Sequence, residues 1–334
     1  FAKLWDIAGV RPLADGSRRL EGLARHGIRF VRADIAAIDP DRLVVETSAG
    51  ALSAEGIVIA LGAGHRPEHV ALLGPGAHNL YDARELPAIR AALEDLSGGR
   101  LLVSILGAPY LCPPAPFEAA LLLNERLGGA AEVVVTTPQP LTLPVAGPDA
   151  SRFLAERLTE QGVAVLTGRQ VEAIDCEAGV ARFADGETLD WRVMLAVPAA
   201  APPPVLACSP LAGPSGWIQP DRHSFATTAE RVYAVGDCTM VPTATAQLPK
   251  AGVFAEAAGT VAAANLAADL RGGERVAFDG HGFCFLELPG RRVATVTGDF
   301  YAEPKPDVRL APGDEASFAA KQEWERERLA AWLG

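Results

Sequence analysis

Five cysteines are the side chains of this sequence best suited to redox chemistry. They stand at Cys112, Cys176, Cys208, Cys238 and Cys284, with no C-x-x-C pair among them. Zinc sites usually need closely spaced ligand pairs, so this spacing argues against a metal centre. An odd count at irregular intervals also argues against a secreted disulfide framework. The sequence leaves open a functional pair drawn from the five.

The segment Leu106-Gly-Ala-Pro-Tyr-Leu-Cys-Pro-Pro-Ala-Pro-Phe-Glu118 places Cys112 between an apolar strand and a helix. The helix dipole favours a thiolate at such a position, and Glu118 could accept a proton. A nicotinamide-binding domain would carry G-x-G-x-x-G at this turn. Here the prolines at 113, 114 and 116 remove amide donors that a phosphate needs. The turn therefore disfavours NAD(P)H.

Two other strand-turn segments, Ile59-Ala-Leu-Gly-Ala63 and Tyr233-Ala-Val-Gly-Asp237, have the form of dinucleotide-binding turns. Gly236 lets a ligand approach the backbone closely, and Asp237 can accept a hydrogen bond from a ligand hydroxyl. The segment Leu248-Pro-Lys-Ala-Gly-Val-Phe-Ala-Glu256 then opens a long helix, whose N-terminus favours negative charge.

These segments resemble flavoproteins with two dinucleotide-binding domains, in particular sulfide:quinone oxidoreductases and flavocytochrome c sulfide dehydrogenases. Both families have a redox-active cysteine where Cys112 stands, with a glutamate six residues later. Gly280-His-Gly-Phe-Cys-Phe-Leu-Glu287 resembles the strand that carries the partner cysteine, here Cys284. The resemblance implies FAD as the cofactor. It implies cofactor contacts at Ile35, Gly62, Gly236, Asp237, Lys250, Ala251 and Gly252, with Lys250 adding its charge at the flavin.

The resemblance implies an enzyme that oxidises sulfide or another small sulfur substrate. Hydrosulfide would attack a disulfide or persulfide joining Cys112 and Cys284, with Glu118 as proton acceptor. The electrons would pass to FAD and then to a quinone or a cytochrome. The other three cysteines are expected to be structural. Two alternatives stay open: an NAD(P)H-dependent flavoprotein (a type II NADH dehydrogenase or a disulfide reductase), and a flavin-less binding or structural remnant.

Strand-helix alternation must position these residues. Apolar strands at 101–106 and 132–136 flank a helix expected over 116–127, which indicates parallel α/β layers. We expect two Rossmann-like domains and a small C-terminal α+β domain. The FAD-binding domain is assigned to 1–80 and 205–275, the inserted NAD-like domain without a glycine fingerprint to 81–204, and the C-terminal domain to 276–334.

Several local elements are also predicted. Strands at 28–31, 34–38 and 42–47 should form a meander that leads into a buried strand at 57–61. A helix is expected over 80–96. The C-terminal domain should hold two short strands and a polar helix, whose residues 321–328 read as a solvated face. The FAD domain's opening βαβ unit with its glycine fingerprint is not found after Phe1, so we expect the sequence to be incomplete.

Composition limits the partners. The net charge of −11 makes nucleic acid an unlikely partner, because phosphate backbones are repelled. The most apolar run, at 251–268, is interrupted by Glu256 and Asn265 and falls short of a bilayer span. Trp324 and Trp332 leave peripheral membrane contact open, and a homo-oligomer is also open. The sequence allows a peripheral membrane, cytoplasmic or periplasmic location.

Overall fold

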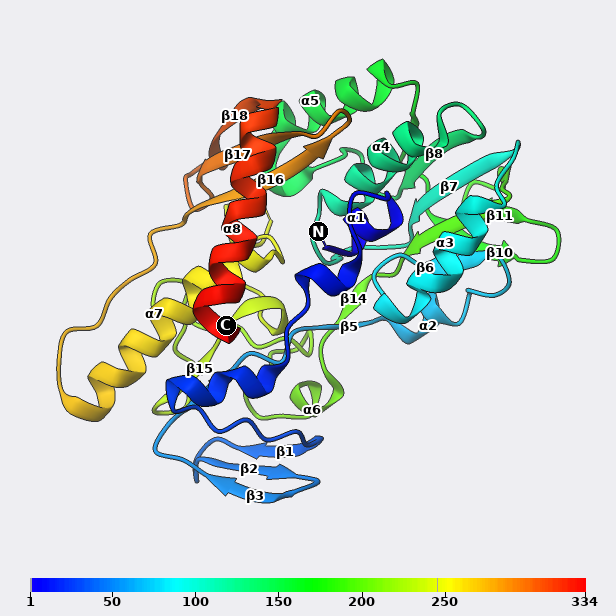
Figure 1. The fold of residues 1–334 in the computed structure, drawn as a ribbon. Helices are drawn as coiled ribbons and strands as arrows, with labels where there is room; N and C mark the ends of the chain where they lie inside the picture. Colours follow the sequence, from blue (N-terminus) through cyan, green and yellow to red (C-terminus); the bar gives the residue numbers. More distant parts are fainter. Residues whose placement is uncertain (1, 245) are drawn as a thin grey trace.

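The computed structural model describes residues 2–244 and 246–334 (Figure 1). Its largest sheet is parallel throughout and has the strand order β6-β13-β7-β8-β9. The strands are β6 (Ala77–Asn79), β7 (Arg100–Ile105), β8 (Glu132–Thr137), β9 (Ala164–Thr167) and β13 (Val193–Val197). The helices that accompany this sheet are α3 (Leu86–Glu94), α4 (Ala115–Leu127) and α5 (Gly147–Glu160). The predicted α/β class is confirmed.

The central strands of this sheet are buried on both faces. Every residue from Leu101 to Ile105 is fully buried, as near-continuous apolar strands of parallel sheets usually are. Parallel strands present their carboxyl ends at one edge, where ligands of open α/β sheets bind. The turn that carries Cys112 runs from the end of β7 to the start of α4, so it lies at that edge.

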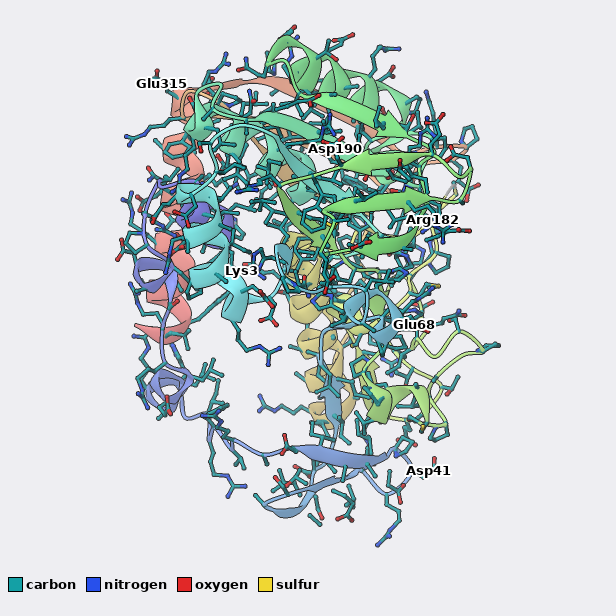
Figure 2. The ribbon with its side chains drawn as sticks, turned by 90° about the vertical axis from the view of Figure 1, so that its right-hand side faces the viewer. Lys3, Asp41, Glu68, Arg182, Asp190 and Glu315 are labelled. Atoms are coloured by element: carbon teal, nitrogen blue, oxygen red, sulfur yellow. The ribbon has the colours of Figure 1, made fainter. Side chains whose placement is uncertain are left out.

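Two antiparallel meanders lie in different parts of the molecule. The first joins β1 (Ile35–Asp39), β2 (Val44–Thr47) and β3 (Gly50–Ser53), and the second joins β10 (Val171–Asp175), β11 (Val180–Phe183) and β12 (Thr188–Asp190). Figure 2 shows their separation through Asp41, in the first, and Arg182, in the second. The predicted strand at 28–31 is wrong: Ile28, Phe30 and Val31 are exposed, and β3 completes the meander by pairing with β2.

The part that contains the Gly236-Asp237 turn is smaller. The strand β4 (Ile57–Ile59) pairs in parallel with β15 (Val232–Ala234), which leads into the short helix η5 (Gly236–Cys238) and then α7 (Gly252–Arg271). Two chain crossings connect this part to the five-stranded sheet through the pair β5 (Gly64–His65) and β14 (Ala200–Ala201). The short helices α2 (Pro67–Val70) and α6 (Pro204–Ala207) flank the crossings.

By length and composition, α7 is the one helix of the described residues that could cross a membrane. Its polar residues instead bind neighbouring segments of the protein. The fully buried Asn265 exchanges hydrogen bonds with the backbone of Val276, and Glu256 pairs with Arg328 of the C-terminal helix at 2.8 Å. These contacts attach α7 to two neighbouring segments, and 22% of its apolar window is buried.

The C-terminal part has three strands where two were predicted. They are β16 (His281–Leu288), β17 (Arg292–Asp299) and β18 (Asp307–Asp314), followed by α8 (Glu315–Leu333). The third strand contains Pro312, which disfavours a strand in the sequence. The structure tolerates it because β18 is an edge strand, and its pairing with β17 is irregular near that end.

The N-terminal segment packs against the helices that surround Cys112. It forms α1 (Ala2–Ile7) and the 3₁₀ turns η1 (Leu13–Gly16) and η2 (Leu20–His26); two further 3₁₀ turns are η3 (Ala83–Glu85) and η4 (Pro144–Ala146). Trp5 of α1 is completely buried, and Asp6 pairs with Arg90 of α3. The helix predicted over 80–96 is shorter, because Asp82 caps η3 and α3 begins only at Leu86.

Candidate active site

A cavity of about 340 Å³ lies where the β7–α4 turn, the start of α7, β16 and α8 meet. The three residues predicted to be catalytic, Cys112, Glu118 and Cys284, all line it. Two predicted cofactor contacts, Ala251 and Gly252, line it as well. The fold thus brings together side chains that are separated by up to 172 positions in the sequence, from Cys112 to Cys284.

The backbone of Cys112 adopts an unusual conformation. Its φ of +45° lies in the left-handed region, which costs energy for a residue with a side chain. Hydrogen bonds hold this geometry: the Cys112 N–H donates to the Lys250 carbonyl at 2.8 Å, and the Cys112 carbonyl accepts from Ala115 N–H at 3.0 Å and from the Tyr81 hydroxyl at 3.3 Å. Strain maintained in this way is typical of functional turns.

Burial controls the two thiols more than the nearby helix does. Although both side chains are partly accessible, the surrounding protein raises the pKa of Cys112 to about 11, and the charge of Glu118 adds to this rise. Burial also raises the pKa of Cys284, and the proximity of Cys112 raises it further. Burial thus acts against the thiolate that the helix dipole predicted at Cys112.

Glu118 lies in the first turn of α4 and is only 3% exposed. One of its oxygens accepts a hydrogen bond from the backbone N–H of Glu287 at 2.7 Å. Burial raises the pKa of Glu118, while the positive charge of Lys321 acts in the opposite direction. A carboxyl group whose pKa is raised beside a cavity is suited to exchanging protons with a bound substrate.

A buried ion pair adjoins this carboxyl group, and the sequence analysis missed it. Lys321 of α8 donates to Glu287 of β16 at 2.5 Å, and the same oxygen accepts from the Trp5 indole at 2.9 Å. Lys321 is 1% exposed and Glu325 is 8% exposed, whereas Glu323, Arg326 and Glu327 are exposed, so the solvated face predicted over 321–328 is only partly correct. A signal was present, because Phe318, Lys321 and Trp324 follow one another at helical spacing on the apolar side of α8.

The turn after β15 has the features expected of a flavin dinucleotide site. Gly236 has a φ of +72°, and the partly buried Asp237 carboxylate has no hydrogen bond or ion pair with any described residue. Burial raises the pKa of Asp237. No side chain of the described residues caps the start of α7, and no atom lies within 4 Å of where a Cβ on Gly252 would be. These groups fit a ligand with hydroxyls and a partial negative charge.

Three other predicted cofactor contacts are placed differently. The Lys250 side chain lies inside the protein, where its ammonium group donates to the backbone carbonyls of Asp237 and Thr239. Gly62 follows β4, and its N–H points toward the sulfur of Cys238. Ile35 lies in β1 and packs against the apolar core around Ile59, so it lines neither the cavity nor the Gly236 turn.

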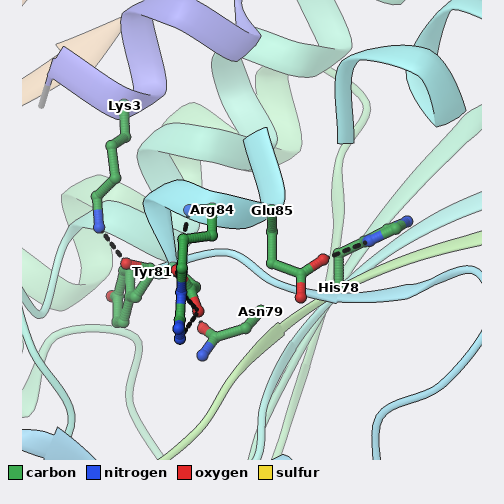
Figure 3. Close-up of polar contacts among 7 residues, drawn as sticks. Lys3, His78, Asn79, Tyr81, Arg84 and Glu85 are labelled. Carbon is green, nitrogen blue, oxygen red and sulfur yellow. Dashed lines mark hydrogen bonds and ion pairs between the residues drawn. The ribbon is translucent and has the colours of Figure 1, made fainter. Parts of the chain in front are cut away.

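Tyr81 forms part of the cavity wall and connects it to α1. Figure 3 shows Lys3 reaching from α1 to the backbone carbonyl of Tyr81. The Tyr81 ring stacks against His65 with centroids 6.3 Å apart. Desolvation lowers the pKa of Lys3 and raises the pKa of Tyr81, so this wall favours uncharged species.

The remaining cysteines lie away from the cavity. Cys208 is exposed, Cys176 lies next to Gly74, and the buried Cys238 thiol contacts the carbonyls of Ile59 and Val235. These positions agree with structural roles, which stay a prediction. Within residues 2–244 and 246–334, no group of three or more histidine, cysteine or acidic side chains could hold a metal ion.

Comparisons with known proteins give a consistent result. The pyridine nucleotide-disulphide oxidoreductase family matches residues 7–264. The mitochondrial sulfide:quinone oxidoreductase of Mus musculus is 23% identical over 262 residues, which cover 73% of this chain and 58% of that protein. The chain therefore spans less than two thirds of this relative's length.

Solved structures show the same fold. The sulfide:quinone oxidoreductase of Aquifex aeolicus superimposes with a TM-score of 0.84 at 21% identity, covering 98% of this chain and 80% of that chain. An NAD-dependent persulfide reductase from A. fulgidus gives a TM-score of 0.61 at 22% identity, covering 80% of this chain and 49% of that chain.

Proposed function

Because this chain belongs to the pyridine nucleotide-disulphide oxidoreductase family, we propose that it oxidises sulfide through Cys112 and Cys284. Family membership makes the protein a flavin-dependent oxidoreductase with FAD as its cofactor. The proposal adds the substrate and the reactive pair. It also adds the electron acceptor, a quinone or a cytochrome.

The observation that carries the proposal is the shared cavity of Cys112, Cys284 and Glu118. A disulfide requires the Cα atoms of its two cysteines to lie within about 7 Å of each other. Cysteines from different domains meet this requirement only if the fold places their segments together. The thiols line one cavity, and the proximity of Cys112 raises the pKa of Cys284. A carboxyl group able to take up a proton lines the same space.

The proposed reaction starts from a disulfide between the two cysteines. Hydrosulfide attacks one sulfur, so that one S–S bond breaks and a new one forms as a persulfide. The other cysteine leaves with the electron pair, and the proton lost by sulfide passes to Glu118. Because burial disfavours both thiolates, the displaced sulfur is a strong nucleophile. When it bonds to the outer sulfur of the persulfide, so that a single sulfur atom bridges Cys112 and Cys284, the two electrons released would pass to the flavin. FAD supplies a two-electron acceptor when it is bound.

The cavity also supports a role for a flat, apolar electron acceptor. Val253, Phe285 and Trp324 contribute apolar surface, and Trp324 stacks edge-on against Phe285 with centroids 5.9 Å apart. Its volume is in the range of small-molecule sites. We therefore favour a quinone over a cytochrome, which would have to accept electrons at the outer surface.

Stopped-flow reduction of the FAD-loaded protein tests the proposal. Sodium sulfide should bleach the flavin absorbance, and NADH at the same concentration should do so on the order of 100-fold more slowly, since prolines occupy the turn that would hold its pyrophosphate. Faster reduction by NADH would favour a pyridine-nucleotide-dependent reductase, which the similarity to the A. fulgidus enzyme keeps as the alternative.

A further inference from the structure

Lys250 is a lysine whose charged end is enclosed by the protein. Its ammonium group donates to the carbonyls of Asp237 and Thr239, each at 2.8 Å, and lies 3.7 Å from the centre of the Trp217 ring. The residue is only 5% exposed. A surface lysine would keep its ammonium in water, so this arrangement needs a reason beyond solubility.

The backbone of the same residue reaches the reactive cysteine. The Lys250 carbonyl accepts the hydrogen bond from the Cys112 N–H at 2.8 Å, which helps to hold Cys112 at its positive φ. Lys250 also stands one position before Ala251, the N-cap of α7. Its side chain thus contacts the turn of Gly236 and Asp237, and its main chain contacts the turn of Cys112.

We propose that Lys250 is a positioning residue that fixes the Cys112 turn relative to the cofactor-binding turn at Gly236–Thr239. The inference rests on the proposed function, because it assumes that Cys112 reacts beside the cofactor. The ammonium holds the two carbonyls and the Trp217 ring in place. The main chain of Lys250 transmits this position to Cys112. Errors of about 1 Å at a reacting centre can lower rates about 100-fold.

The charge of Lys250 provides a specific signature. Burial lowers its pKa to about 8, while the nearby Asp237 carboxylate and Cys238 act in the opposite direction. Tyr110 of the β7–α4 turn borders the adjoining cavity of about 150 Å³. As pH rises through about 8, the neutral amine loses its attraction to the ring and binds the carbonyls more weakly. The limiting rate should fall over the same pH interval.

The main test compares Lys250→Met with Lys305→Met, the same change at an exposed lysine. In FAD-loaded protein, Lys250→Met should lower the limiting rate of flavin reduction by sodium sulfide about 10- to 100-fold and remove its decline near pH 8. Reduction by dithionite should stay at the wild-type rate. Lys305→Met should behave as wild type throughout. An unchanged limiting rate and pH profile in Lys250→Met would overturn the proposal.

A second measurement does not depend on sulfide. Iodoacetamide labelling of the reduced protein, followed by mass spectrometry, reports how freely Cys112 moves. Lys250→Met should label Cys112 about three- to tenfold faster relative to Cys284. If sulfide fails to reduce the wild-type flavin, the proposed function fails and this ratio alone decides the role of Lys250. Loss of FAD with an unchanged ratio would assign Lys250 to cofactor binding instead, and overturn positioning.

Trp217→Leu covers the case in which Lys250→Met does not fold. This variant keeps the lysine but removes the ring that stabilises its charge. The decline of the limiting rate should then move to lower pH by about one unit. A profile identical to wild type would contradict a role for the charge of Lys250.

Discussion

Two strand-to-helix turns of the site use the same architecture in different ways. After β7, the chain runs through Cys112 and enters α4 with Pro114 at the N-cap. After β15, it passes Gly236 and later enters α7 with Gly252 as the first residue. The second turn offers open backbone and free amides. The first replaces amide donors with prolines and adds a thiol.

This difference shows how a nucleotide-binding turn can become a reactive one. A phosphate needs N–H groups that point into solvent, whereas a redox cysteine needs a fixed backbone and little water. The β7–α4 turn satisfies the second need through prolines and through the bonds to the Cys112 carbonyl and N–H. The fold around both turns is similar, so the chemistry depends on the few residues placed in them.

Removing the thiols tests this difference between the two turns most directly. Cys112→Ser and Cys284→Ser should each lower sulfide-dependent flavin reduction by at least about 1,000-fold, because serine cannot form the disulfide that sulfide attacks. Stopped-flow absorbance measures this rate. Cys176→Ser and Cys208→Ser serve as controls and should stay within about twofold of wild type. A Cys112→Ser, Cys284→Ser double variant that keeps the wild-type rate would refute the pair.

The surroundings of Cys112 also include the C-terminal helix α8, whose Lys321 forms a buried ion pair with Glu287. The Gly236 turn does not contact this ion pair. Lys321→Met should lower the free energy of unfolding by about 3 kcal/mol, because Glu287 is left buried without its cation. Urea denaturation followed by circular dichroism measures the change. Adding Glu287→Leu should recover more than half of the loss, and Lys305→Met should shift it by less than about 0.5 kcal/mol. A single variant as stable as wild type would contradict the energetic role of the pair.

Substitution of Glu118 should impair proton transfer while leaving the two thiols in place. Glu118→Gln should lower the rate of sulfide-dependent reduction about 100-fold, since the amide cannot accept a proton. The folded protein raises the pKa of this carboxyl group, so its basic form is lost as pH falls through a value above the usual glutamate range. The wild-type rate should decline on that acidic side, and the variant should lack the decline. Identical pH profiles would rule out Glu118 as the base.

Substitution of one glycine in each part gives a smaller, matched effect. Gly236→Ala and Gly128→Ala both place a side chain at a positive φ, +72° and +56°, and should each cost about 1 kcal/mol of stability. Only Gly236→Ala should also weaken FAD binding, by about tenfold, because Gly128 merely ends α4. Fluorescence titration with FAD distinguishes them. Equal losses of affinity would show that the Gly236 effect is global.

Local motifs made much of the site predictable. The Cys112–Glu118 segment and the Gly236–Asp237 turn are each continuous in sequence, and helix and strand periodicity placed them at element ends. The thiol ionisation at Cys112 was not predictable, because it depends on burial by segments distant in the chain. A helix dipole can be inferred from neighbouring residues, but desolvation cannot.

The network of Trp5, Glu287 and Lys321 needed three distant segments to meet, so the helical spacing around Lys321 could indicate a buried face of α8 but not these partners. The mixed charges of α8 indicate a solvated surface, because the sequence does not show that this helix packs against β17. The strand predictions failed for related reasons. Ile28 and Phe30 alternate with arginines as in a strand, but they have no partner strand among the described residues. Pro312, in contrast, obscured the edge strand β18, which pairs with β17.

The prolines beside Cys112 have a consequence for conformational entropy. Pro113, Pro114 and Pro116 restrict their own φ angles even in the unfolded chain, so this turn gives up less freedom on folding than an ordinary segment, which loses about 1–2 kcal/mol per residue. A turn with so few alternative conformations has little tendency to open. We therefore expect warming to accelerate the reaction through sulfide arrival and bond exchange, without a contribution from ordering this turn.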